Sequence, residues 1–230
     1  MTLAAAPIER PDRLKDLAFR KIKSLLTEGR LESDRIYSAN QFADTLAVSR
    51  TPVREALLQL ATEGFLVFVE GRGFKIRRYT PKEVQDFFET RRLIETHVAQ
   101  KLTGKLTPED LAHLGANLRL MKACAAGRGA ARFLEADQEF HMSLVRRHNN
   151  LHLASLMEGI RGHIAIFGLK AIAHEGRFLE VVQEHAAILA ALRGRQPAKV
   201  VRAVLVHLHT TERYVLAEVR PAEAGEKRSG

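Results

Sequence analysis

The chain has 230 residues, 46% hydrophobic and 27% charged, which is enough to bury a core as one large or two small domains. Its formal net charge of +9 suggests a polyanionic partner, although the basic surplus is spread over the whole chain and does not locate a binding surface. The single cysteine excludes an internal disulfide and a thiolate metal cage, and neither a secretion signal nor an apolar run long enough for a membrane span is present, so we expect a cytoplasmic protein.

The first predicted element is an amphipathic helix over residues 12–28, where apolar residues recur at helical spacing and Gly29 supplies a stop. Ser38 is a suitable N-cap for a short second helix that carries Phe42 and Leu46. A tight turn then leads into a third helix, and this spacing of two helices is typical of a helix-turn-helix.

The third helix begins in the stretch VSRTPVREALLQL, residues 48–60. Ser49 or Thr51 can cap it, and Pro52 suits a first turn because an N–H there has no intrahelical partner. Arg50 and Arg54 lie one turn apart near its start, where guanidinium groups can donate to guanine or phosphate in a major groove. The alternative is that both arginines only solvate a helix face.

Two strands are predicted after the third helix, Leu66–Val69 and Phe74–Ile76, and a glycine turn joins them. A hairpin beside the second helix of a helix-turn-helix is a wing, and Arg72 at its tip can reach a minor groove or a phosphate. The order of cap, turn, helix and wing favours DNA binding over a merely solvated helix face.

The segment SANQFADTLAVSRTPVREALLQLATEGFLVFVEGRGFKI resembles the winged-helix domain of the GntR family of bacterial transcription regulators. The resemblance implies a homodimer on a double-stranded DNA operator. It also implies DNA contacts by six residues on the third helix and the wing: Arg50, Thr51, Arg54, Gly71, Arg72 and Gly73. Ala47 stands where the family usually has glycine, which costs up to about 1 kcal/mol if that backbone is left-handed.

Residues 80–83, Thr-Pro-Lys-Glu, form a capping sequence, so we expect a DNA-binding domain over 1–79 and a second domain over 80–220. Helical patterns separated by turn signals predict six helices in this second domain: 82–102, 108–126, 130–147, 151–172, 176–193 and 197–219. Short connections indicate an antiparallel bundle, which makes the fold mostly α, and residues 221–230 are expected to form a disordered tail.

Four polar residues are expected to point into the core of this bundle. Asp137 and His141 are spaced i, i+4 beside Phe133 and Phe140, while His185 and His207 lie on the apolar stripes of two later helices. A divalent cation would satisfy this buried set of nitrogen and oxygen ligands, with zinc preferred over nickel, manganese or iron. The alternative is that each histidine is separately hydrogen-bonded in the core or at the surface.

Residues 82–216 resemble the FCD ligand-binding domain of the FadR-type subgroup of GntR regulators, in which an Asp and three His residues form a metal site. Asp137, His141, His185 and His207 match that pattern. The resemblance also implies a carboxylate effector at the metal, and Arg91 is the candidate anion clamp because a guanidinium binds a carboxylate through two N–H groups. The alternative for Arg91 is an ion pair with Glu95 on the helix surface.

These features predict a metabolite-responsive transcription factor, most simply a repressor, that is not an enzyme. A small organic acid at the metal site would shift the dimer between two states with different DNA affinity. Two alternatives remain open at this point: a metal-dependent enzyme with a helical catalytic domain, and a constitutive DNA-binding protein with a structural metal.

Overall fold

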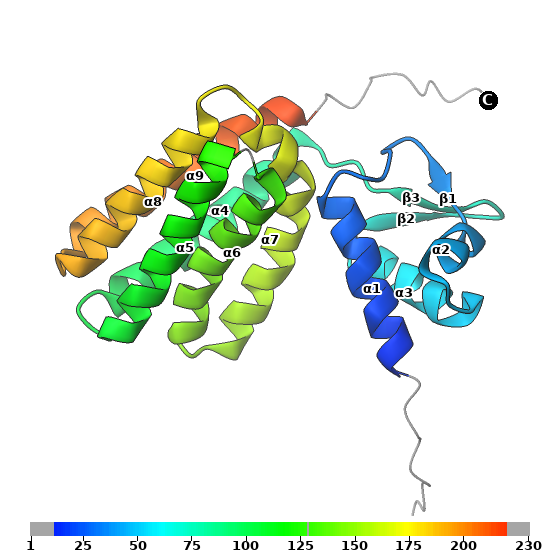
Figure 1. Ribbon diagram of the computed structural model, residues 1–230, viewed down its shortest axis with the longest axis horizontal. Helices are drawn as coiled ribbons and strands as arrows, with labels where there is room; N and C mark the ends of the chain where they lie inside the picture. The colour runs from blue at the N-terminus through cyan, green and yellow to red at the C-terminus, as the bar shows by residue number, and fades with distance from the viewer. Residues whose placement is uncertain (1–11, 128, 220–230) are drawn as a thin grey trace, which may run out of the picture. The chain divides into compact units, whose positions relative to one another are not determined.

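The structure is a computed structural model that describes residues 12–127 and 129–219, and this part of the chain is mostly helical (Figure 1). A winged helix-turn-helix is followed by a helical bundle, which confirms the predicted fold class. The chain divides into two compact units between Arg78 and Tyr79. The tail predicted at residues 221–230 lies outside the described residues. No helix in the described ranges is both long and apolar enough to cross a membrane.

The first unit contains three helices and three short strands. They are α1 (Asp12–Thr27), β1 (Ile36–Tyr37), α2 (Ala39–Leu46), α3 (Arg50–Thr62), β2 (Leu66–Val69) and β3 (Gly73–Ile76). Helices α1 and α2 both pack against α3, and Ile22, Leu57 and Leu60 are fully buried between them. The inward face of α3 is therefore apolar, as its sequence pattern predicts, and its polar face remains outside.

The turn between α2 and α3 is built by local side-chain and backbone chemistry. Ser38 accepts a hydrogen bond from the N–H of Gln41, whose side chain in turn accepts from the N–H of Ser38, so a full capping box starts α2. Ala47 ends this helix with φ 53° and ψ 43°, the left-handed conformation in which glycine is usual. Ser49 occupies the N-cap position of α3, but its side chain makes no capping hydrogen bond.

The wing is part of a three-stranded antiparallel sheet with the order β1-β3-β2. Strand β1 was not predicted, and it pairs Ile36 with Lys75 and Tyr37 with Phe74. Strand β3 begins at Gly73, one residue earlier than predicted. A Cβ at Gly73 would lie 2.4 Å from the carbonyl oxygen of Tyr37, so close pairing with β1 requires glycine here.

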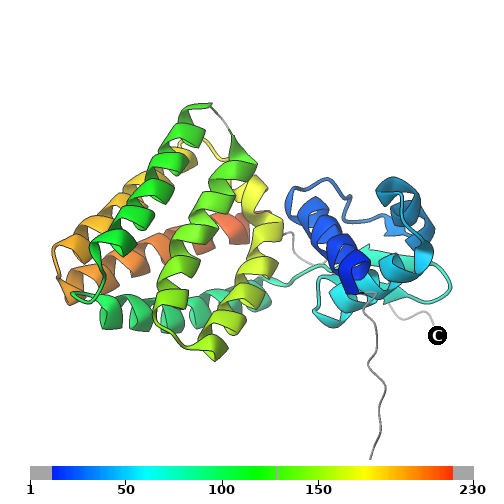
Figure 2. The same cartoon turned by 60° about the horizontal axis from the view of Figure 1, so that its bottom comes forward.

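The second unit is a bundle of six helices. They are α4 (Pro81–Leu102), α5 (Pro108–Gly127), α6 (Ala130–Arg147), α7 (Leu151–Ile172), α8 (Arg177–Arg193) and α9 (Pro197–Glu218). Helix α4 packs along α9, α6 lies between α5 and α7, and α8 contacts both α5 and α9 (Figures 1 and 2). A capping box starts α4 at Thr80, as predicted, and another starts α5 at Thr107.

The core of the bundle is lined by apolar side chains from all six helices, among them the fully buried Met121, Phe133, Phe140 and Ile188. A few charged and polar side chains are buried in the same interior. They are Arg91, Glu95, Asn117, His141, Arg161, Arg177, His185 and His207. Buried ionisable groups are costly unless they are paired, so their partners indicate what this interior is built to hold.

Candidate metal centre and DNA-contact surface

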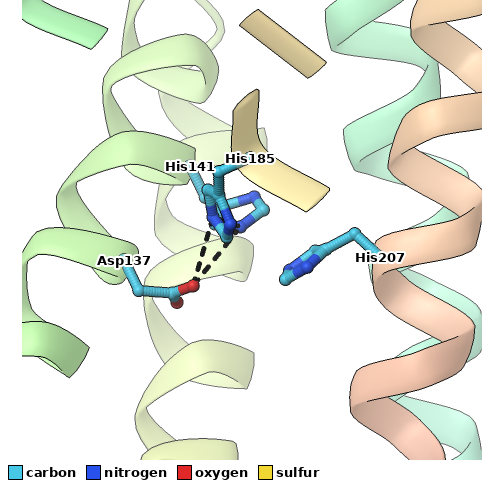
Figure 3. A group of neighbouring side chains, drawn as sticks. All are labelled: Asp137, His141, His185 and His207. Carbon is cyan, nitrogen blue, oxygen red and sulfur yellow. Dashed lines mark hydrogen bonds and ion pairs between the residues drawn. The ribbon is translucent and has the colours of Figure 1, made fainter. Parts of the chain in front are cut away.

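Asp137, His141, His185 and His207 meet inside the bundle, and one potential ligand atom from each lies within 4.8 Å of the others. The first two come from α6, His185 from α8 and His207 from α9 (Figure 3). Nε2 of His185 lies 3.2 Å from Oδ1 of Asp137 and 3.1 Å from Nε2 of His141. Three imidazoles and one carboxylate are a donor set that suits a divalent transition metal.

Each of the three imidazoles is oriented by an oxygen acceptor at its Nδ1. His141 faces Oε2 of Glu95 at 2.5 Å, His185 faces the carbonyl of Val181 at 2.8 Å, and His207 faces Oε2 of Glu184 at 2.7 Å. These oxygens can only accept, so they favour the tautomer with the proton on Nδ1, which leaves the Nε2 lone pair for a metal. Metal-binding histidines are commonly held in this way by an outer acceptor.

Burial favours the neutral form of His141 and His207. It lowers the pKa of His141 to about 3, although Glu95 opposes the shift. Burial and the neighbouring His185 hold the pKa of His207 well below its usual 6.5. Neutral imidazoles are the form that binds metal, so near neutral pH these two side chains require no proton release before coordination.

The carboxylates of the cluster stay ionised despite their burial. Burial would raise the pKa of Asp137, but the Arg161 guanidinium opposes this effect, and the pKa is held well below its usual range. Burial would likewise raise the pKa of Glu95, and Arg91 and His141 together reverse that effect. The site thus combines ionised carboxylates with the neutral imidazoles of His141 and His207.

Two buried arginines adjoin the cluster. Arg91 donates from Nε to Oε1 of Glu95 at 2.7 Å, so the ion pair between these two residues exists but lies in the interior and not on the helix surface. Arg161, from α7, donates from Nη2 to Oδ2 of Asp137 at 2.6 Å. Nη2 of Arg91 and both Nε and Nη1 of Arg161 are buried without a hydrogen-bond partner among the described residues. A buried N–H donor without a hydrogen bond costs folding free energy, and an anionic ligand could accept from these groups.

Arg161 was not among the predicted site residues. A signal for it was available, because it follows Met157 and precedes Ile164 on the buried stripe of α7. An arginine on an apolar stripe is unusual unless it is paired.

Asn150 caps α7 by accepting from the N–H groups of His152 and Leu153, which gives it a structural role.

The predicted DNA contacts lie at the surface of the first unit. Arg50, Thr51 and Arg54 are exposed on the first two turns of α3. Gly71 and Arg72 are exposed at the wing tip, where Arg72 N–H donates to the carbonyl of Val69 and closes the turn. Gly73 is half-buried, because its backbone lies against Tyr37.

Each of the two units matches a known protein-family model. Residues 14–76 match the model of bacterial regulatory proteins of the gntR family, and residues 86–210 match the FCD domain. The Nta operon transcriptional regulator of Aminobacter aminovorans is 29% identical over 79% of this chain and 85% of its own length. The gluconate operon transcriptional repressor of Bacillus licheniformis is 29% identical over 61% of this chain and 58% of its own.

A solved structure of Escherichia coli McbR/YncC has the same fold, with a TM-score of 0.80 and 19% identity over 90% of this chain and 99% of that one. The relatives with assigned roles are transcriptional regulators, not enzymes. The chain belongs to the GntR family of bacterial regulatory proteins, with an FCD domain after its winged helix-turn-helix.

Proposed function

We propose that this chain is a homodimeric transcriptional repressor that binds one divalent metal ion and whose affinity for operator DNA responds to a small organic acid. Residues 1–79 would bind DNA and residues 80–220 would bind metal and effector. The observation that carries the proposal is the cluster of Asp137 and three histidines, next to buried guanidinium nitrogens that have no hydrogen-bond partner in the described part of the chain.

The metal assignment rests on the donor atoms. Three imidazole nitrogens and one carboxylate oxygen suit zinc best, and nickel, manganese or iron accept the same set. The outer acceptors at each Nδ1 further support metal binding, because they present Nε2 to the centre of the cluster. A bound ion would supply a positive centre to which a carboxylate oxygen of the effector can coordinate.

The effector assignment rests on charge and hydrogen bonding. Arg91 and Arg161 neutralise Glu95 and Asp137, and each arginine has at least one buried nitrogen with no partner among the described side chains and backbone. A carboxylate ligand would satisfy these donors, as Arg–carboxylate pairs do elsewhere. The related repressor of a gluconate operon is named for a hydroxylated carboxylic acid, which is compatible with this class of ligand.

The DNA assignment rests on the exposed residues of α3 and the wing. Arg50, Thr51 and Arg54 would enter the major groove, while the wing tip from Gly71 to Gly73 would contact the backbone or the minor groove. Two copies would read the two halves of a palindromic operator in the bacterial cytoplasm, since the symmetry of a dimer matches that of a palindrome.

Metal analysis combined with a thermal-shift screen of carboxylic acids tests the proposal. We expect one metal ion per chain, and at least one acid that stabilises the metal-loaded protein but not the chelator-treated protein. The amide of the same acid serves as the control and should not stabilise either form. A protein that binds no divalent metal would refute the proposed site. If neither metal nor acid changed the affinity for DNA, the protein would be a constitutive DNA-binding protein.

A further inference from the structure

Arg177, the first residue of α8, is one of the largest fully buried side chains in the described part of the chain. Its Nη1 donates to Oε1 of Glu184 at 2.7 Å and its Nη2 donates to Oε2 of Glu184 at 3.1 Å. Nη2 also donates to Oγ1 of Thr211 on α9 at 2.8 Å. One guanidinium therefore holds both oxygens of a carboxylate and a hydroxyl on the neighbouring helix.

Glu184 connects this guanidinium to the candidate metal centre. Its Oε2 accepts from Nδ1 of His207, which comes from α9 (Figure 3), and the next residue along α8 is the candidate ligand His185. The two hydrogen bonds from Arg177 fix the plane of the Glu184 carboxylate. The orientation of this carboxylate in turn determines how the His207 ring is oriented. The rings of His185 and His207 lie 4.6 Å apart between the two helices.

A second set of contacts joins α8 and α9 at the same place. The guanidinium of Arg177 lies 4.9 Å from the ring centre of Tyr214, whose hydroxyl donates to Oε2 of Glu180 at 3.1 Å. Nη1 of Arg177 also reaches Glu180 at 3.3 Å. These contacts restrict the Arg177 side chain from several sides, so little rotamer freedom remains for it or for Glu184.

The Arg177–Glu184–His207 series has a counterpart in Arg91–Glu95–His141. In both, an arginine fixes a glutamate on its own helix and the glutamate accepts from Nδ1 of a candidate metal ligand on another helix. The two arginines differ in one respect. Nη2 of Arg91 has no partner among the residues that the structure describes, whereas protein groups engage both Nη atoms of Arg177, so Arg177 has less capacity for a ligand.

We infer that Arg177 is a positioning residue for the metal centre: it orients Glu184, and through Glu184 the His207 imidazole, without touching the metal. The inference rests on the proposed metal site. A buried ion pair is weak evidence for a stabilising role, since apolar side chains of similar size often replace such pairs without loss of stability. Orientation of a ligand through an outer carboxylate, by contrast, changes metal affinity about 10- to 100-fold.

The test is a Zn²⁺ competition titration of the full chain against a chromophoric chelator. We expect R177M to bind Zn²⁺ about 10- to 100-fold more weakly than the wild type, and E184Q to show a loss of similar size. Because Arg177 acts through Glu184, the R177M/E184Q double variant should be no more than about 3-fold weaker than E184Q. Replacement of the exposed Arg193, in the last turn of α8, with Met is the matched control and should leave affinity unchanged.

Co²⁺ absorption spectra supply a second readout, because a change in ligand orientation alters the visible bands whereas a loss confined to stability does not. If R177M fails to fold, T211V removes a single hydrogen bond to the same guanidinium and should weaken Zn²⁺ binding about 3-fold or more. Wild-type Zn²⁺ affinity in R177M or in a folded T211V would overturn the inference, as would fully additive losses in the double variant. A wild-type chain that binds no Zn²⁺ would instead refute the proposed metal site itself.

Discussion

The carboxylate of Asp137 is divided between two partners: Oδ2 accepts from Nη2 of Arg161 at 2.6 Å, and Oδ1 faces Nε2 of His185 at 3.2 Å. Arg161 lies on α7 and His185 on α8, so this carboxylate connects three helices. It thereby joins Arg161, two of whose nitrogens have no partner within the described ranges, to the histidine cluster. A ligand that pairs with Arg161 would therefore also act on a candidate metal ligand.

Replacement of Arg161 with Met should destabilise the metal-free protein by about 3–5 kcal/mol, because it leaves the largely buried Asp137 carboxylate without its arginine counter-ion. Zn²⁺ should restore part of this loss, since the ion is itself a counter-charge. Urea denaturation with and without Zn²⁺ measures both effects. Arg146 is the control, because its pair with Glu139 is exposed and its replacement with Met should cost about 1 kcal/mol or less. Equal losses in the two variants would contradict the assigned role of Arg161.

The chelator-treated protein should become less stable as the pH falls from about 6.5 to about 3. The pKa of His141 is about 3 in the fold against a usual 6.5, so between these values the unfolded chain binds a proton that the folded chain does not. His207 acts in the same direction. Asp137 and Glu95, whose pKa values are held low in the fold, add to this loss as the pH falls below their usual pKa values of 3.8 and 4.5.

Urea midpoints measured across this pH range check the prediction. Replacement of His141 with Gln removes one titrating group. The unfolding free energy should then fall less steeply with falling pH, by a slope that corresponds to at most one bound proton per molecule. Wild-type and H141Q proteins with the same slope would show that His141 does not contribute to acid sensitivity.

Ala47→Gly should raise the free energy of unfolding by up to about 1 kcal/mol. Ala47 has φ 53°, where a Cβ is unfavourable and glycine is not. The opposite sign is expected for Ala186→Gly, an exposed position inside α8, where glycine costs about 1 kcal/mol relative to alanine. Thermal or urea unfolding of the two variants compares them directly, and destabilisation by both would show that the turn does not favour glycine.

Arg54→Ala should weaken operator binding and relax the base preference at one step of each half-site, by about 1–3 kcal/mol for a bidentate contact. Selection from random duplexes followed by footprinting reports both affinity and sequence profile. Arg30, exposed after the end of α1, supplies the control, and its replacement with Ala should leave the profile intact. An unchanged profile for the Arg54 variant would remove this residue from the recognition surface.

The helices could be predicted closely because their signals are local. Thr80 and Glu83 sit three residues apart and cap each other, and the apolar stripes repeat along each helix. Most predicted helix ends differ from the observed ones by one residue at most. Strand β1 escaped prediction because it has two residues and exists only through pairing with β3, some forty residues later. A contact of that kind leaves no periodic pattern in the sequence.

The same distinction separates the site residues that could be predicted from those that could not. Asp137 and His141 are one turn apart on an apolar stripe, so their inward direction follows from helix geometry. Glu95 reaches the cluster from another helix, through a contact that only the packed bundle defines. The stripe of α7 indicates that Arg161 points inward, but its pairing with Asp137 depends on how α6 and α7 pack. Arg177 is further removed, because its role depends on Glu184 and on the approach of α9.

The central claim is that the metal site in the bundle controls DNA binding, and fluorescence anisotropy of a labelled operator fragment tests it most directly. For the metal-loaded wild type, the acid found by thermal shift should change the Kd for the operator by about 5- to 150-fold. In a folded H185A/H207A variant the same acid should leave the Kd unchanged, because that variant has lost two of the four candidate ligands. An equal response in the variant, or a wild-type Kd indifferent to both metal and acid, would contradict the account.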